Sequence, residues 1–245
     1  MVIGLGLFGI VVGFCSGFFG IGGGTVLVPA LIYAGYDIKV AIGISVVQMV
    51  MGSLFGSYLN YKDGQLQLGH GLFLGLGAFV GASFSGAIVT ALPRVVLLII
   101  FASILALSIY KFFMAPLEPK SEPKRSKILL FSVGLGIGLV AISVGTGGAV
   151  FLTPILVGFL SWEIKQAVST SLFFVIFGSI SGFISLSAHG LVDYTDGFIV
   201  GLCSLIGVYF GVKQSHIVSK KMQKRLLLSL YCVLLALTVN KIFQS

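Results

Sequence analysis

Long apolar segments, separated by short clusters of charged and turn-forming residues, make up most of this chain. Several of them exceed about 18 residues, the length at which a helix can cross the hydrocarbon core of a bilayer. They are too long for barrel strands, and they do not alternate apolar with polar positions. The pattern therefore predicts an all-α, polytopic integral membrane protein. Full-length helices are expected over residues 39–61, 66–92, 93–114, 164–187, 192–212 and 222–243.

Two further apolar segments, residues 3–35 and 128–160, are interrupted by glycines. The first contains Gly-Ile-Gly-Gly-Gly-Thr-Val-Leu-Val-Pro from Gly20, and the second contains Gly-Thr-Gly-Gly-Ala-Val-Phe-Leu-Thr-Pro from Gly145. Glycine adopts backbone dihedral angles that other residues avoid, and proline lacks an amide proton. We therefore predict that each segment forms a helical hairpin. The predicted structural helix breaks are Pro29 and Pro154.

The two interrupted segments begin two copies of one longer pattern. The glycine breaks are 125 positions apart, and further glycines recur at a shift of 126. Glycines one helical turn apart let helices approach closely within a bilayer. We predict two repeats, residues 1–114 and 128–245, each a hairpin followed by three membrane-spanning helices. The linker between them, residues 115–127, is rich in proline and charge, which is typical of an aqueous connection.

The composition agrees with a membrane protein. Only 9% of the 245 residues are charged and 57% are apolar, whereas about 25% are charged in a typical soluble domain. The net charge of +8 would suggest a nucleic-acid partner in a soluble protein. Here it indicates basic cytoplasmic loops, so we expect contact with a lipid bilayer and no nucleic acid. The three cysteines lack the spacing of a zinc or disulfide framework, so neither a metal nor a cofactor is expected.

The basic residues distinguish two arrangements of the interrupted segments. If each segment crosses the bilayer once, seven basic residues lie on one side and eight on the other. If each segment returns to its own side as a hairpin, the division becomes twelve against three. Cytoplasmic loops carry an excess of lysine and arginine, which favours the hairpins. The two repeats are then inverted, both termini lie outside the cell membrane, and the 115–127 linker is cytoplasmic.

The chemistry expected at the breaks is anion binding. A helix that begins inside the membrane leaves amide protons without acceptors and carries the positive end of its dipole there. Together these bind an anion without a basic side chain. Nearby hydroxyls and one amide side chain could add donors. The candidate substrate-binding residues are Gly20, Gly22, Gly23, Gly24, Thr25, Ser45, Gln48, Gly145, Thr146, Gly147, Gly148, Ser169, Thr170 and Ser171.

Simpler interpretations of the same residues stay open at this stage. The glycines could serve only to form tight turns, and each hydroxyl could bond to a carbonyl of its own helix. Gln48 is either a residue that joins helices or a donor in the site. Ala149 stands where the first repeat has Gly24, so the sequence predicts that a methyl group at Gly24 is tolerated.

Enzymatic chemistry is disfavoured, and no catalytic residue is predicted. The first glycine run is not followed by Lys-Ser or Lys-Thr, so it is not a phosphate-binding P-loop. The apolar segments contain serines but no buried histidine or aspartate to activate them. The coupling ion stays open, with a proton as one candidate, because no carboxylate lies deep in an apolar segment. A passive anion channel is the main alternative to a secondary transporter, and the oligomeric state is not predicted beyond a possible homo-oligomer.

The paired motifs resemble those of the TauE/SafE family of sulfite and sulfonate permeases. Residues 17–29 with Ala-Ile-Gly-Ile-Ser over 41–45 resemble the signature of its first repeat, and residues 145–154 with Ala-Val-Ser-Thr-Ser over 167–171 resemble the second. The resemblance covers the whole chain. It implies a secondary transporter, typically an exporter, that holds a small sulfur-containing anion between the breaks and works by alternating access. Ala149 and the Gly-Ile-Ser at 43–45 depart from the pattern, which predicts two unequal half-sites.

Overall fold

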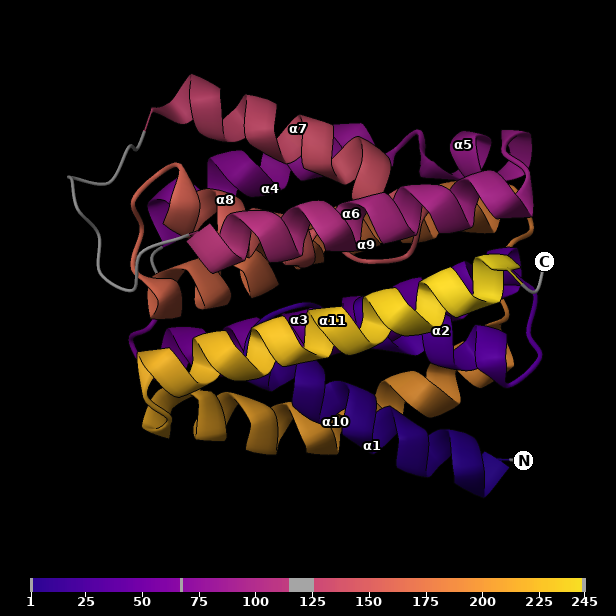
Figure 1. The fold of residues 1–245 in the computed structure, drawn as a ribbon, viewed down its shortest axis with the longest axis horizontal. Helices are drawn as coiled ribbons and strands as arrows, with labels where there is room; N and C mark the ends of the chain where they lie inside the picture. Colours follow the sequence, from indigo (N-terminus) through magenta and orange to yellow (C-terminus); the bar gives the residue numbers. More distant parts are fainter. Residues whose placement is uncertain (1, 67, 115–125, 244–245) are drawn as a thin grey trace.

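The structure is a computed structural model that describes residues 2–66, 68–114 and 126–243 (Figure 1). Helices are the only regular secondary structure among these residues. Within the part of the chain that the structure describes, six helical segments are long and apolar enough to span a bilayer: α3, α4 together with α5, α6, α9, α10 and α11. Most of the predicted linker, residues 115–125, lies outside the described residues. The helices are α1 (Val2–Phe19), α2 (Gly24–Tyr33), α3 (Ile38–Lys62), α4 (Leu68–Ala82), α5 (Ser85–Ala91), α6 (Arg94–Met114), α7 (Lys127–Ser143), α8 (Ala149–Gly158), α9 (Ile164–Ala188), α10 (Tyr194–Ile217) and α11 (Lys220–Phe243).

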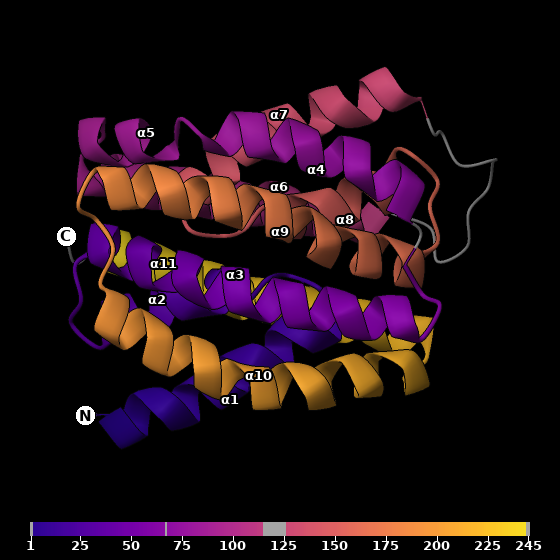
Figure 2. The same ribbon diagram turned by 180° about the vertical axis from the view of Figure 1, so that it is seen from behind.

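Each interrupted segment forms a pair of short helices that returns to the end of the bundle from which it started. Helix α1 runs inward from the end that holds both termini, and α2 leads back to that end (Figure 1). Helices α7 and α8 do the same from the opposite end, and the view from behind agrees (Figure 2). The two hairpins therefore enter the bundle from opposite ends.

The segment expected to be one helix over 66–92 is divided in two. Helix α4 ends at Ala82 and α5 begins at Ser85, with a turn between them. The Ser185 hydroxyl of α9 donates to the carbonyl of Ser83 (2.8 Å) and accepts from the amide of Gly86 (2.9 Å). A side chain from another helix thus satisfies backbone groups that the turn releases, as an interruption inside a membrane requires.

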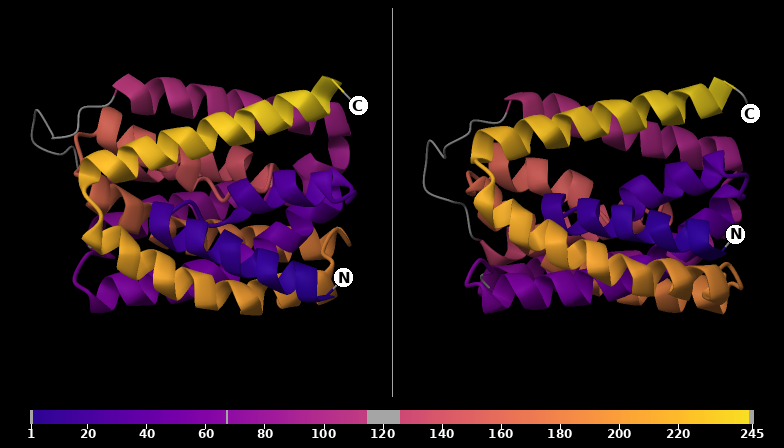
Figure 3. Two further views of the ribbon diagram at one scale, coloured as in Figure 1. Left: turned by 60° about the horizontal axis from the view of Figure 1, so that its bottom comes forward. Right: turned by 90° about the horizontal axis from the view of Figure 1, so that it is seen from below.

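Helices α3 and α9 occupy the centre of the bundle and contact each other. Helix α3 also packs on α10, and α9 packs on α4. The first helix of each hairpin packs along a helix of the other half, α1 on α10 and α7 on α4. A Cβ atom at Gly13 or Gly207 would overlap the facing backbone of the α1–α10 pair, so only glycine permits this approach. Helices α6 and α11 lie side by side on one face (Figure 3).

Polar residues stop and start the helices at the end of the bundle that holds both termini. The Asp37 carboxylate accepts from the amide of Lys39 (2.8 Å) and caps α3. The Tyr36 hydroxyl donates to Asp196 in the first turn of α10 (2.6 Å). This hydrogen bond to the carboxylate is the main reason that the pKa of Tyr36 rises to about 12, so the phenol stays a neutral donor at physiological pH.

The outer surface is apolar, as a bilayer requires. Leucine, isoleucine and phenylalanine side chains are exposed on most helices, including Phe113, Ile128 and Ile217. A water-soluble protein seldom exposes so much contiguous apolar surface. Together with the six spans, this surface makes the chain a multi-pass membrane protein.

Candidate functional site

Six glycines with left-handed backbone form the two chain reversals. Their φ angles lie between 67° and 83°, a region that L side chains adopt only with strain. The prolines do not end helices, which corrects the prediction: Pro29 lies inside α2 and Pro154 inside α8. The interruption therefore lies wholly at the glycines preceding these helices. The six are Gly20, Gly22, Gly23, Gly145, Gly147 and Gly148.

The first break leaves a run of backbone amides without protein acceptors. The amide of Gly20 still donates to Ser16 (2.9 Å), and the carbonyl of Gly23 accepts from the first turn of α2. Between the amide of Gly20 and that of Val26, which donates to Gly23, the amides of residues 21–25 donate no hydrogen bond within the described part of the chain. These five groups stand at the positive end of the α2 dipole. They are the strongest set of unused donors around the breaks.

The second break satisfies more of its own amides. Gly145 donates to Ile142, and Thr146 donates to Ala141, both at 2.9 Å. The Thr146 hydroxyl donates to the same Ala141 carbonyl (2.9 Å) and accepts from the amide of Gly148 (3.4 Å). The first break has Ile21 at the position of Thr146, so it lacks this hydroxyl. The two breaks therefore differ in their free amides, and the Thr146 hydroxyl accounts for the engaged amide of Gly148.

The two breaks lie against each other inside the bundle. The Thr25 hydroxyl donates to the carbonyl of Thr146 (3.3 Å). The Ser45 hydroxyl donates mainly to Ile42 in its own helix (2.8 Å) and lies 3.4 Å from the carbonyl of Gly145. All residues of both breaks, Thr25 and Ser45 are buried, so the described conformation is closed around this contact.

Gly24 is the tightest point of the contact. A Cβ atom built there would overlap the carbonyl oxygen of Gly145 and come within 2.8 Å of the Met49 sulfur. The prediction that a methyl is tolerated at Gly24 is therefore wrong. Ala149, at the matching position of the second repeat, is fully buried. The second repeat therefore has room for a methyl group where the first repeat has none.

The remaining predicted residues divide between the breaks and other contacts. Gln48 is fully buried, and its carboxamide lies directly against Gly23. Ser171 accepts a hydrogen bond from Thr153 of α8 (2.9 Å), and the Thr170 methyl lies near Gly71 of α4. Ser169 is buried, whereas the contacts of Thr170 and Ser171 are with α4 and α8.

Apolar side chains that the sequence analysis did not select complete the walls. A Cβ at Gly22 would meet Val175, and a Cβ at Gly147 would meet Met49. Met49 and Val175 are related by the shift of 126, as are Gln48 and Phe174, which packs against Gly148. Aligning the two repeats could have indicated these wall residues, because residues at matching positions of the two repeats lie against matching glycines.

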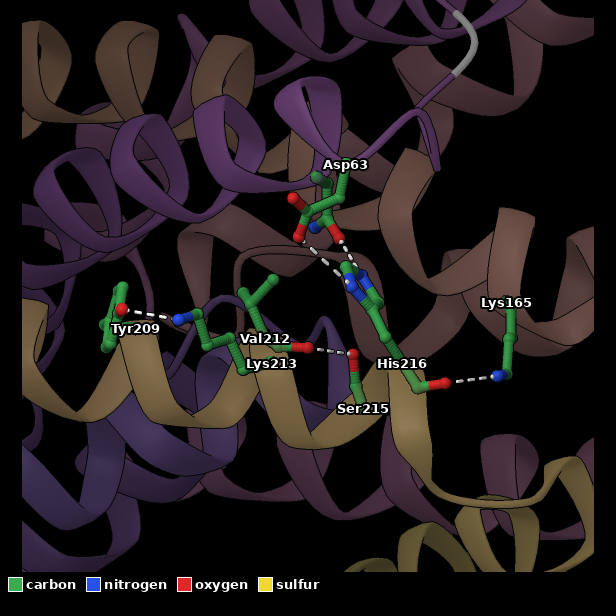
Figure 4. Close-up of polar contacts among 8 residues, drawn as sticks. Asp63, Lys165, Tyr209, Val212, Lys213, Ser215 and His216 are labelled. Atoms are coloured by element: carbon green, nitrogen blue, oxygen red, sulfur yellow. Dashed lines mark hydrogen bonds and ion pairs between the residues drawn. The ribbon is translucent and has the colours of Figure 1, made fainter.

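A second polar cluster joins helix ends on the side of the bundle opposite the termini. Figure 4 shows Asp63, which follows α3, facing His216 of α10. The His216 Nδ1 lies 3.3 Å from the Asp63 carboxylate, and its Nε2 lies 2.9 Å from Asn60 Oδ1. The Lys165 amine donates to the His216 carbonyl (2.8 Å). The cluster ties α3, α9 and α10 together at this end, and sequence spacing alone gave no sign of it.

Comparison with known proteins identifies the family. The sequence pattern of the family described as sulfite exporter TauE/SafE matches residues 5–239. The probable membrane transporter protein YdhB of Bacillus subtilis (strain 168) is 28% identical over 221 residues, covering 86% of this chain and 89% of that protein. A probable membrane transporter protein of Haemophilus influenzae is 29% identical over 219 residues, covering 82% of this chain and 81% of that protein. No solved structure matches the chain. The chain, a membrane transporter rather than an enzyme, belongs to the sulfite exporter TauE/SafE family.

Proposed function

We propose that this protein is a secondary transporter that exports a small sulfur-containing anion, such as sulfite or a sulfonate, across the cell membrane. The family description supports the substrate class and the direction. The observation that carries the proposal is the run of free amides over residues 21–25, buried in the middle of the bundle. An anionic oxygen satisfies such donors better than any neutral group, since hydrogen bonds to charged groups contribute about 1.5–3 kcal/mol each.

The arrangement of the hairpins supports a mechanism of alternating access. We propose that residues 1–114 and 128–245 are inverted repeats, because their hairpins enter from opposite ends and pack on matching helices. Broken helices that meet between inverted repeats are a recurrent substrate site of secondary transporters. In the described conformation both breaks are buried, which corresponds to a closed state. Rocking of one half against the other would open the contact toward one side at a time.

Binding and counterflow measurements test this function. Purified protein should bind sulfite or a small sulfonate more tightly than a carboxylate of the same size. In proteoliposomes, labelled substrate should enter against its gradient when the unlabelled anion is inside. The competing function, a passive anion channel, predicts flux that does not saturate and shows no counterflow. That result, or equal binding of all anions, would contradict the proposal.

The fixed basic residues should contribute little to binding. The amines of Lys39 and Lys165 donate to the carbonyls of Thr90 (3.3 Å) and His216 (2.8 Å) at the ends of the bundle. We therefore expect Lys39→Gln and Lys165→Gln to change the substrate Kd by less than about threefold, which is under 1 kcal/mol. Isothermal titration of both variants measures this. Loss of binding in either would show that a lysine, rather than backbone amides, recognises the charge.

The proposed orientation places both termini outside the cell. In a variant without Cys15, Cys203 and Cys232, single cysteines at Ala34 and Ser126 probe the two ends of the bundle, since both positions are exposed. A membrane-impermeant maleimide added to intact cells should label the Ala34→Cys variant and spare Ser126→Cys until the cells are broken. Labelling of Ser126→Cys but not of Ala34→Cys in intact cells would show that both termini face the cytoplasm, and would contradict the proposed orientation.

A further inference from the structure

Gln48 has a buried oxygen that no described residue satisfies. The side chain is fully buried in the middle of α3, and its Oε1 has no hydrogen-bond partner among the described residues. Its Nε2 lies 3.4 Å from the hydroxyl of Ser204 in α10. A Cβ at Gly23 would overlap Gln48 Oε1, so this oxygen is aimed at the first break.

The hydrogen bonds of Ser204 determine which way the carboxamide faces. The Ser204 hydroxyl donates its single proton to the carbonyl of Gly201 at 2.7 Å. It can then only accept from Gln48, which requires the amide nitrogen on that side. The acceptor Oε1 therefore faces Gly23 and the glycine turn. Rotating the carboxamide would set two acceptors, Gln48 Oε1 and the Ser204 oxygen, against each other unless that serine gave up its bond to Gly201.

The first break thus presents two unmet requirements at one place. The amides of residues 21–25 are donors that require an anionic oxygen. Gln48 Oε1, beside Gly23, is an acceptor that requires a proton donor. A fully deprotonated anion without a donor group would satisfy the amides but would leave Gln48 Oε1 without a proton donor. It would also bring one of its own oxygens close to Oε1, which is another acceptor.

We propose that Gln48 is a specificity-determining residue that selects a small anion carrying its own hydrogen-bond donor. This inference rests on the proposed function and specifies its substrate. The anionic oxygens accept from the amides of the first break, and a hydroxyl or N–H group of the same molecule donates to Gln48 Oε1. Two chemical sources fit: a hydroxyl or amino group on a short alkyl sulfonate, or the acid proton of a singly protonated oxyanion.

The second break does not offer a matching acceptor. The residue equivalent to Gln48 is Phe174, whose ring lies against Gly148. The Gly148 amide is also engaged by the Thr146 hydroxyl. The donor of the substrate is therefore directed to the first break, which gives the anion one preferred orientation. Phe174 also provides a matched control, since it occupies the same position relative to the other glycine turn.

The test compares two sulfonates with equal numbers of heavy atoms. In 2-hydroxyethanesulfonate a hydroxyl replaces the terminal methyl of propane-1-sulfonate. Wild-type protein should bind the hydroxylated compound about tenfold more tightly, the value of one hydrogen bond to an otherwise unsatisfied buried acceptor. Sulfite titrated at pH values below and above its second deprotonation tests the alternative source of the proton. Tighter binding of the protonated form would assign the donor to the acid proton, and it supports the proposal equally.

Gln48→Met removes the acceptor while keeping the length of the side chain. Both preferences should then fall below about twofold, whereas Phe174→Leu should retain them. Wild-type protein that binds anions with neither preference would overturn the role of Gln48 but leave the transport function intact, and this comparison requires no variant to fold. Preferences that persist in Gln48→Met would overturn it as well. Failure of wild-type protein to bind any anion of the panel would overturn the proposed function itself.

Discussion

Gly23→Ala should weaken binding of the transported anion at least tenfold while leaving the protein folded. The new methyl group would overlap the end of the Gln48 side chain, a flexible group that can move aside into the anion site. The left-handed backbone at Gly23, with φ of 83°, adds strain of roughly 1–2 kcal/mol. Losing one charge-assisted hydrogen bond costs about 1.5–3 kcal/mol, which corresponds to about ten- to a hundredfold in Kd.

Two matched variants separate strain from binding. Gly64 has a similar φ of 69° with open space around its Cβ position, so Gly64→Ala carries the strain without touching the breaks. It should bind the anion normally. Gly148→Ala places its methyl against Ile137 and Phe174, and its amide already has the Thr146 hydroxyl, so a smaller loss than at Gly23 is expected. Equal Kd values for Gly23→Ala and Gly64→Ala, measured by titration calorimetry in detergent, would remove the first break from the site.

Gly24→Ala should destabilise the whole protein rather than alter its affinity. The added methyl meets the backbone carbonyl of Gly145, which cannot rotate away as a side chain can. The two hairpins would have to separate, and overpacking of this kind costs about 1–3 kcal/mol, sometimes more. We expect a lower yield of monodisperse protein and a larger fall in Tm than for Gly23→Ala, whose methyl group meets the movable end of a side chain.

Gly136→Ala is the control for this destabilisation. Gly136 lies in α7, is exposed, and has nothing near its Cβ position. Its substitution should leave Tm unchanged or raise it, because alanine favours helix more than glycine does. If Gly24→Ala proved as stable as Gly136→Ala in thermal unfolding, the close contact between the breaks would be refuted. Ala149 would then be the better guide to this position.

The sequence predicted the helical class and the neighbourhood of the breaks because both depend on local composition. An apolar run of more than about 18 residues has few alternatives to a membrane helix. The glycine runs at 20–24 and 145–148 marked the reversals correctly, since only glycine adopts the φ angles observed there without strain. The prolines misled because membrane helices accommodate proline where neighbouring groups satisfy the freed backbone. Pro29 stands in the second turn of α2 and Pro154 in that of α8, and both helices continue past them.

Other features of the site depended on partners that are distant in the chain. The break between α4 and α5 relies on Ser185, about a hundred residues away, which takes over the released backbone groups. The orientation of the Gln48 carboxamide relies on Ser204 of α10. The intolerance of a methyl at Gly24 relies on the Gly145 carbonyl. No local pattern encodes these contacts, so comparison of the two repeats alone led to the wrong expectation at Gly24.

By itself, the sequence determined that this chain is a helical membrane protein with two glycine-interrupted segments and a strongly basic set of loops. The length of an apolar run, the dihedral angles open to glycine and the charge of a loop depend only on single residues and their neighbours in the chain. They can therefore be recognised without knowing the fold. Only the tertiary structure decided which amides stay free, which hydroxyls are already used and which oxygen faces the first break. The physical reason is that hydrogen bonding is a competition among all nearby partners, and packing α3, α9 and α10 around the breaks determines which partners are near.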